Sequence, residues 1–139
     1  MATFVPFQSF IEALAEKKHD LGSDQLKVAL TNVAPTAATG AQLSDITEIV
    51  NYANCSAREV TTSSSEHTAG TYKLICADLE LTATGDVGPF RYIVLYNDDA
   101  TDDLLIAYWD RGNSITLMNG EKLDLDFDGV NGVVKIAPV

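Results

Sequence analysis

Hydrophobic and polar residues alternate along most of the second half of the chain, as they do in β-strands that bury one face. The stretch TYKLICADLELTAT, residues 71–84, puts Ile75 and Leu81 on one face and Asp78 and Glu80 on the other. FRYIVLY is apolar on both faces, and this predicts a central strand. The segments LLIAYWD, SITLM, KLDLDFD and VVKIAP that follow it are each predicted as a strand.

The N-terminal part of the chain contains a long helical pattern, PFQSFIEALAEKKHDLG, at residues 6–22. Apolar side chains recur at helical spacing within it: Phe7, Phe10, Ile11 and Leu14. Pro6 suits the first turn and Gly22 the position beyond the end, while the basic KKH before Gly22 suits the negative end of the helix dipole. The sequence predicts one amphipathic helix that docks on a sheet.

The segments between this helix and residue 71 are shorter and more polar. QLKVALTN and AREVTT are predicted as strands, whereas SSSEHTAG, rich in small polar residues, is predicted as a flexible turn. A small-residue linker occupies 33–42. LSDITEIV, after it, is predicted as a helical turn capped by Ser44.

Turn signals separate the predicted strands at about ten-residue spacing. Asn119-Gly120 is the strongest of them, because a two-residue type I′ hairpin turn needs positive φ at both central residues. Connections this short exclude parallel βαβ units. The sequence predicts a mainly β fold, an antiparallel β-sandwich or jelly roll with one N-terminal amphipathic helix, as a single domain over 1–139 with a short arm at 1–7.

Composition narrows the classes of partner. The 139 residues are 46% hydrophobic and 21% charged, the balance of a globular protein. The net charge of −11, with nine Lys and Arg in total, argues against nucleic acid as a partner, since phosphate binding needs basic side chains. No apolar run approaches the roughly 20 residues of a membrane span, and the N-terminus lacks an export-signal pattern, so we expect no membrane partner and synthesis in a cytoplasm.

The loop between two apolar runs in YNDDATDDLL carries four aspartates: Asp98, Asp99, Asp102 and Asp103. They could form a calcium site or the solvated tip of a β-hairpin. The stretch lacks the glycine and the closing glutamate of an EF-hand loop. Aspartate also favours turns, because its side chain bonds nearby backbone N–H groups. The hairpin tip is the favoured interpretation, and calcium binding is left open.

A second acidic pattern, KLDLDFD, places Asp124, Asp126 and Asp128 at spacing two. In a strand these carboxylates share one face and the apolar residues take the other. A divalent ion could bind such a face. The favoured interpretation is an acidic, solvated face that also discourages stray strand pairing at a sheet edge.

The residues that carry most enzyme chemistry are few and scattered. Cys55, Cys76, His19 and His67 lie in no metal, redox or nucleophile motif, and Arg58 is interpreted as an ordinary surface residue. The cysteines are interpreted as reduced, mostly buried thiols. We therefore expect a protein that is not an enzyme, with no catalytic residue, no metal and no cofactor.

Aromatic side chains are the better candidates for an interaction surface. Tyr108 and Trp109 are consecutive in one predicted strand, so they face opposite ways, and an outward ring would be adhesive. In the arm, Phe4 and Phe7 could leave the domain to bury on a neighbour, or Phe4 could simply cover the domain's own sheet. The predicted interface residues are Phe4, Phe7, Tyr108 and Trp109.

Three stretches carry a resemblance to a known class of protein: DLGSDQLKVALTNVAP, the block TYKLICADLELTATGDVGPFRYIVLYNDDATDDLLIAYWDRGNSITLMNGEKLDLDFDG, and NGVVKIAP. Together they resemble small structural proteins of tailed bacteriophages, above all in the part from Pro89 to Gly129. The resemblance lies in the overall pattern and brings no catalytic residues. It implies a virion component of the capsid decoration (cement) kind, made in the host cytoplasm. Its implied partners are the major capsid protein or another virion protein and further copies of itself, with a trimer favoured.

Three functions follow for comparison with the structure. The first is a capsid decoration protein that binds and stabilises the head shell. The second is a tail, neck or fibre-associated virion protein, because one small β domain is reused at several places. The third is a carbohydrate-binding module, in which exposed aromatic rings would stack on sugars.

Overall fold

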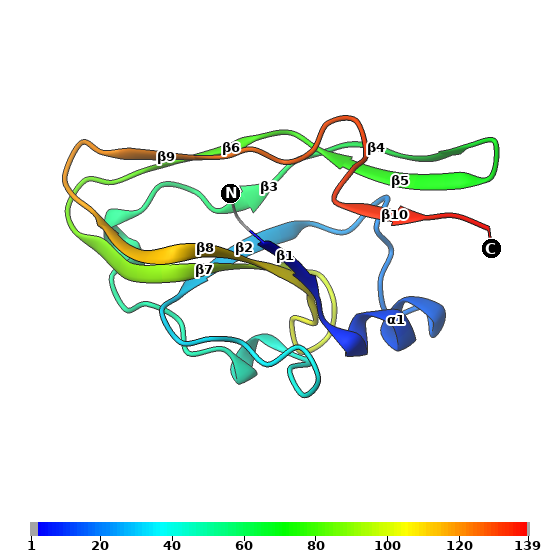
Figure 1. Cartoon of the computed structure of the whole chain (residues 1–139), viewed down its shortest axis with the longest axis horizontal. Coiled ribbons are helices and arrows are strands. Elements are labelled where there is room, and N and C mark those ends of the chain that lie inside the picture. The colour runs from blue at the N-terminus through cyan, green and yellow to red at the C-terminus, as the bar shows by residue number, and fades with distance from the viewer. Residues whose placement is uncertain (1–2, 139) are drawn as a thin grey trace.

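The computed structural model describes residues 3–138, which form two layers of β-sheet with one α-helix at the end of the stack (Figure 1). Every strand pairing within it is antiparallel. The predicted mainly β, antiparallel fold with an N-terminal helix is therefore confirmed. The elements in chain order are β1 Thr3–Pro6, α1 Gln8–Ala15, β2 Leu26–Thr31, η1 Leu43–Asp45, η2 Tyr52–Asn54, β3 Glu59–Val60, β4 Thr62–Thr68, β5 Thr71–Cys76, β6 Leu79–Thr82, β7 Val87–Asn97, β8 Leu105–Leu117, β9 Lys122–Leu125 and β10 Val134–Ile136.

One layer is a five-stranded sheet with the order β1-β8-β7-β2-β3, and the other contains a three-stranded sheet, β10-β5-β4, and a pair, β6-β9. The strand β7, which contains FRYIVLY, is central in the larger sheet, as its two apolar faces predict. The main hydrophobic core fills the space between the layers and includes Leu26, Phe90 and Leu74.

A smaller apolar cluster lies on the outer face of the five-stranded sheet. It consists of Phe7, Ala29, Val94, Tyr96 and Leu105. Leu43 and Ile46, in the polypeptide between β2 and β3, pack against it. Both faces are thus buried along most of β2, over the last five residues of β7 and over the first three of β8, which accounts for the runs of consecutive apolar residues there.

The helix α1 is shorter than the pattern from Pro6 to Gly22 predicts. Pro6 belongs to β1, and the helix ends after Ala15 because Lys17 adopts a left-handed φ of 66°. Phe10 and Ala13 are its buried residues, whereas Ile11 is 70% exposed. The helix therefore docks through a narrower stripe than predicted.

The helical turn predicted in LSDITEIV is present as η1, but its predicted cap is corrected. The N-cap of η1 is Gln42 and not Ser44.

The stretch SSSEHTAG is mostly strand β4, where the sequence predicts a flexible turn. It pairs with β5 from Thr62 opposite Cys76 to Thr68 opposite Thr71. Only Ala69 and Gly70, with φ of 52° and 82°, make the reversal. Because pairing uses backbone groups, an exposed strand of small polar residues forms against a good partner without an apolar face of its own.

The predicted strands LLIAYWD and SITLM are parts of one strand, β8. Its register with β7 changes from Phe90 opposite Ile115 to Tyr92 opposite Asp110, so the residues 111–114 bulge from the sheet. Asp110 accepts two hydrogen bonds from Arg91, at 2.7 and 3.0 Å, beside this bulge. A polar DRGNS segment thus marks an irregularity within a strand and not a turn between two.

The Asn119-Gly120 signal marks a turn but not a hairpin. The amide of Glu121 donates to the carbonyl of Met118 at 2.9 Å, and of the two central residues only Gly120 has positive φ, 88°. The strands on either side of it, β8 and β9, belong to different layers. The chain crosses between the layers here, which a type I′ hairpin turn would not allow.

Candidate functional site

A groove of about 1000 Å³ is lined by residues of β1 and β8 in the larger sheet and of β9 and β10 in the facing layer. Six residues of the core cluster, or packed against it, line the groove: Ile93, Trp109, Leu123, Leu125, Phe127 and Val133. Four of them are only 5–7% exposed, so the accessible apolar side chains are those of Phe4, Trp109 and Leu123. An apolar surface that continues into the core is the typical signature of a binding surface.

The floor of the groove is aromatic. Phe4 on β1 lies directly opposite Trp109 on β8, with ring centroids 5.4 Å apart. The Trp109 ring lies 5.6 Å from the Phe127 ring. Phe4 is 43% exposed, and Trp109 is partly buried beneath it. The structure thus brings two of the four predicted interface residues into one surface.

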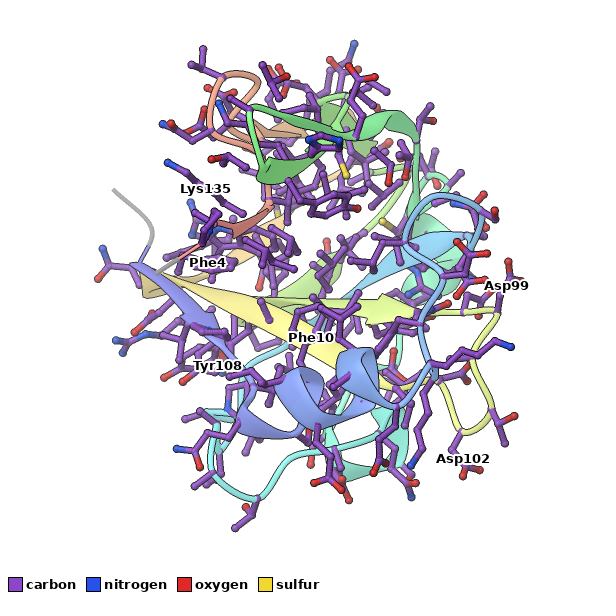
Figure 2. The ribbon with its side chains drawn as sticks, turned by 90° about the vertical axis from the view of Figure 1, so that its right-hand side faces the viewer. Phe4, Phe10, Asp99, Asp102, Tyr108 and Lys135 are labelled. Carbon is purple, nitrogen blue, oxygen red and sulfur yellow. The ribbon has the colours of Figure 1, made fainter. Side chains whose placement is uncertain are left out.

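The other two predicted interface residues lie on the opposite face of the same sheet. The rings of Phe7 and Tyr108 are 5.4 Å apart in the smaller apolar cluster, and Phe7 is 0% exposed. Figure 2 shows Phe4 and Tyr108 on opposite sides of the β8 ribbon. The prediction of Phe7 as an outward anchor is corrected, because its ring is core. An arm over 1–7 that leaves the domain would take Phe7 out of that core.

Charged side chains from both layers form the rim of the groove. Asp124, Asp126 and Asp128 come from β9 and the segment after it, Lys135 comes from β10, and Arg111 from the bulge of β8. Asp124 and Asp126 are exposed and Leu125 is buried, as the alternation in KLDLDFD predicts. No ion pair of the described residues involves Asp124, Asp126 or Lys135.

Asp128 has a structural role in the turn between β9 and β10. Its carboxylate accepts hydrogen bonds from the backbone N–H of Asn131 at 2.8 Å, from the Asn131 side chain at 3.0 Å and from the backbone N–H of Val130 at 2.9 Å. These bonds hold the pKa of the Asp128 carboxyl below its usual range. This acid therefore shapes the rim, whereas Asp124 and Asp126 are available to a partner.

The four-aspartate loop lies on the other side of the molecule, where Figure 2 shows Asp99 and Asp102 far across the view from Phe4 and Lys135. Asp99 accepts a hydrogen bond from the backbone N–H of Gln25 at 2.8 Å, and Asp102 and Asp103 adopt positive φ of 66° and 51°. The loop borders a hollow of about 550 Å³ that Lys17 and Lys18 also line. Within residues 3–138, no three His, Cys, Asp or Glu side chains are grouped as metal ligands.

A buried polar cluster holds this loop to the segment after α1. The Asn97 Oδ1 accepts from the backbone N–H groups of Asp99 and Ala100, so the Asn97 Nδ2 is the donor to Asp24 Oδ2, at 2.6 Å, and to His19 Nδ1, at 3.0 Å. The His19 ring is 6% exposed, and the structure corrects its predicted place in the last turn of the helix. Its pKa is lowered by burial, which the charge of Asp24 partly opposes.

The remaining reactive or charged side chains have structural surroundings. Burial raises the pKa of the Cys76 thiol to about 11 and raises that of Cys55, and both are free. The Arg58 guanidinium lies 3.7 Å from the centre of the Tyr52 ring and donates to the Val28 carbonyl at 2.7 Å. Arg58 is thus part of the packing between β2 and the segment before β3, and not an ordinary surface residue.

The fold and the groove together define an antiparallel two-layer β protein with one N-terminal helix and an uncovered aromatic side. No protein-family model, no curated protein and no solved structure matches this chain. None of the helices among the described residues is long and apolar enough to cross a membrane.

Proposed function

We propose that this chain is a structural protein of a tailed bacteriophage, a capsid decoration protein that binds the head shell and stabilises it. The observation that carries the proposal is the groove on one side of the sandwich, which core residues line and where the 43% exposed Phe4 packs on Trp109. The block from Pro89 to Gly129, where the resemblance to phage structural proteins is strongest, forms most of β7, β8 and β9, and these strands supply much of the groove.

The proposed mechanism is burial of apolar area. Each Å² of apolar surface removed from water contributes about 25 cal/mol to binding. The loss of translational, rotational and side-chain freedom on association offsets a large part of this gain. One copy therefore binds modestly, while many copies distributed over a shell add their contributions. A ligand that binds the assembled shell and not its separated subunits stabilises the shell by mass action.

The proposed partner is the major capsid protein or another virion protein, and the proposed place is the virion after synthesis in the host cytoplasm. The net charge of −11 suits a neutral or basic protein surface and disfavours a direct contact with packaged nucleic acid. The protein would act through shape and adhesive area, without catalysis, metal or cofactor.

The test uses particles that lack this protein, to which the purified chain is added back. We expect saturable binding, a copy number comparable to that of the capsid subunit, and a higher temperature of DNA release from the particles. Phe4→Ser should weaken binding, whereas Val50→Ser, which changes a 99% exposed apolar residue elsewhere, should not. Failure of the wild-type chain to bind such particles contradicts the proposal.

The number of copies per particle distinguishes the first alternative, a tail, neck or fibre-associated protein, from a decoration protein. A tail, neck or fibre-associated protein from the same virion would be present in the small number set by the symmetry of that structure. Electron microscopy of particles labelled with an antibody to the chain would then show label at one vertex or along the tail, not over the head.

A carbohydrate-binding module is the second alternative, and one observation favours it. The Trp109 and Phe4 rings share their groove with carboxylate and amide side chains, including those of Asp124 and Asn131, which suit sugar hydroxyls. Titration of the chain with a glycan panel, followed by Trp109 fluorescence, tests it. Saturable quenching by one sugar class, without particle binding, would favour the module over the virion protein.

A further inference from the structure

A buried histidine joins two segments on the side of the molecule away from the groove, where Figure 2 shows Asp99 and Asp102. His19 lies in the segment after α1, and Asn97 ends β7, where the four-aspartate loop begins. His19 is 6% exposed and Asn97 is 0% exposed. Histidine gains its charge between about pH 5 and pH 8, so a proton can act on the structure at this contact.

The hydrogen bonds of Asn97 decide which nitrogen of His19 carries the proton. Asn97 Oδ1 accepts from the backbone N–H groups of Asp99 and Ala100, at 3.0 and 3.1 Å. Asn97 Nδ2 therefore donates, to Asp24 Oδ2 at 2.6 Å and to His19 Nδ1 at 3.0 Å. A ring nitrogen that accepts carries no hydrogen, so the neutral His19 ring has its proton on Nε2.

The Nε2–H group of His19 is buried without a hydrogen-bond partner among residues 3–138. The Phe10 ring of α1 packs edge-on against the imidazole, with ring centroids 5.2 Å apart, and offers no acceptor in the plane of the donor. A buried donor that loses water without gaining a partner lowers stability. The contact between the two segments thus has an unfavourable component even when His19 is neutral.

A second proton on the His19 ring, at Nδ1, would meet another donor, the Asn97 Nδ2–H group. Turning the Asn97 amide over would bring its oxygen to His19, but it would also set this oxygen against the Asp24 carboxylate. The amide nitrogen would then face the N–H groups of Asp99 and Ala100. Neither orientation satisfies all members of the cluster, so protonation of His19 must break bonds that hold the loop.

The charges around His19 do not remove this conflict. Of the described residues, Asp24 is the one whose charge acts on His19, and its attraction only partly opposes the burial that lowers the pKa of the ring. Asp24 Oδ2 already accepts from Asn97 and from the backbone N–H of Asp20, at 2.8 Å. The other charged side chains nearby line the hollow beside the loop: Lys17, Lys18, Asp20, Asp99 and Asp102.

The loop from 98 to 103 is the part of this contact that can move. Its side chains are exposed or half-buried, and none belongs to a hydrophobic cluster, whereas Leu21 anchors the segment after α1 in the core. Elements that are held by hydrogen bonds, with little buried apolar area, open locally at a lower free energy than global unfolding. Loss of the Asn97 bonds should therefore open the loop while the sandwich stays folded.

We propose that the cluster of His19, Asn97 and Asp24 is a pH-sensitive latch, which holds the four-aspartate loop closed at neutral pH and releases it when His19 gains a proton in mild acid. The open form binds the proton more readily than the closed form. A decrease in pH below about 6.5 therefore favours opening. The latch lies away from the groove, so it can be present whether or not the chain binds a capsid.

Nuclear magnetic resonance of the wild-type chain tests the closed form first. The ¹⁵N shifts of the His19 ring at pH 7.5 should show hydrogen on Nε2 and none on Nδ1. Hydrogen on Nδ1 would overturn the latch, because that nitrogen would already donate at neutral pH and a further proton would not change its contact with Asn97.

Amide hydrogen exchange at pH 7.5 and pH 5.5, corrected for the intrinsic pH dependence of exchange, tests the release. The N–H groups of Asp99 and Ala100 should lose protection several-fold at pH 5.5, with a ceiling of about tenfold that the ordinary histidine pKa of about 6.5 sets between these values. Their exchange should depend little on urea, as in local opening. The Gly120 N–H, bonded to the Ala83 carbonyl at 2.8 Å in a turn between the layers, should keep its protection.

Two variants assign the response to one ring. His19→Gln cannot gain the proton and should remove the pH dependence of the loop amides, whereas His67→Gln, at an exposed position, should retain it. Four results would overturn the latch: loop protection that is equal at the two pH values, protection that rises in acid because His19 pairs with Asp24, loop exchange with the urea dependence of global unfolding, or a response that persists in His19→Gln. The wild-type measurements decide the matter if His19→Gln does not fold.

Discussion

Phe4 and Trp109 face each other across β1 and β8, and their contact joins the N-terminal strand to the floor of the groove. Tyr108, the neighbour of Trp109 in sequence, contacts Phe7 on the other face of the same sheet. Two adjacent residues of β8 thus each contact an aromatic ring of the N-terminal segment, one on each face of the sheet. One ring remains at the surface and the other is part of the core, so their substitutions should have different consequences.

Phe4→Ala should cost about 1 kcal/mol of unfolding free energy, because it removes a partly exposed aromatic pair. It should also shift the fluorescence emission of Trp109, the one tryptophan of the chain, to longer wavelength as water reaches its ring. Val50→Ala is the control and should change neither quantity. An unchanged emission spectrum in the Phe4 variant would mean that the ring does not shield Trp109.

Phe7→Ala should cost about 3–5 kcal/mol, the usual range for a fully buried phenylalanine. The surroundings of Phe7 are tight, since a Cβ built on Gly40 would lie 2.8 Å from the Phe7 Cε1. Urea unfolding measures the loss. Ile11→Ala, at a residue 70% exposed, should stay within about 0.5 kcal/mol, and equal effects of the two substitutions would contradict the burial of Phe7.

The stability of the fold should fall as the pH decreases below about 6.5, the ordinary pKa of histidine. His19 has a lowered pKa in the folded state, so the unfolded chain binds a proton first and protonation favours unfolding. A proton on Nδ1 would also place two donors face to face, because the Asn97 Nδ2 donates to that nitrogen. Phe10 and Asp24 are the other neighbours, and attraction to the Asp24 carboxylate opposes the effect without reversing it.

The urea midpoint at pH 7.5 and at pH 5.5 measures this dependence for the wild type and for His19→Gln, in which it should be smaller. His67 is the matched control, since it is exposed and its Nδ1 only accepts from the Gly70 amide at 3.3 Å. His67→Gln should retain the wild-type dependence. The assignment to His19 is wrong if the two variants behave alike.

Asn97→Ala should destabilise the fold by about 2 kcal/mol or more, because it leaves buried polar partners unsatisfied. Asn97 is 0% exposed and its side chain bonds four groups, two in the segment after α1 and two in the four-aspartate loop. Asp98→Asn, at an exposed position of the same loop, should change the unfolding free energy by less than about 0.5 kcal/mol. Chemical denaturation of both variants measures the contrast, and a mild Asn97→Ala would mean that the loop does not depend on this amide.

Neither calcium nor EDTA should change the melting temperature. The Asp99 carboxylate bonds the Gln25 amide, and the hollow beside the loop includes two lysines among its acids. A ligand that binds only the native state raises the melting temperature, and the stabilisation grows with the logarithm of its concentration once that exceeds the dissociation constant. A rise of several degrees in millimolar calcium would identify the loop as a cation site.

The sequence predicts the fold best where side-chain alternation and burial coincide. FRYIVLY is apolar on both faces and occupies the centre of the larger sheet, while the acids of KLDLDFD alternate with buried Leu125 and Phe127. The sequence predicts the fold least well where backbone hydrogen bonding or backbone conformation, and not a side-chain pattern, determines the structure. The strand β4 has polar side chains and forms by pairing with β5, and Lys17 ends the helix by a left-handed conformation that lysine does not signal.

The candidate site is predictable in part. The choice of Phe4 and Trp109 as interface residues follows from aromatic residues in strands, although no pattern in the sequence states that they are paired. The groove itself joins β1, β8, β9 and β10, which are distant in the chain. Arg111 and Lys135 were missed for this reason, and the one local signal was a basic residue in the polar stretch that interrupts β8.

The pairing of β1 with β8 has a consequence for biosynthesis. Thr3 lies opposite Asp110, so the first strand emerges from the ribosome 107 residues before its partner (110 − 3 = 107). Contacts this distant are slow to form, and the cluster that buries the Phe7 ring is complete only once Leu105 of β8 has been made. Nascent chains in which β8 has not yet been synthesised should therefore stay open to chaperones and proteases, and β1 should join the larger sheet only after β8 has emerged.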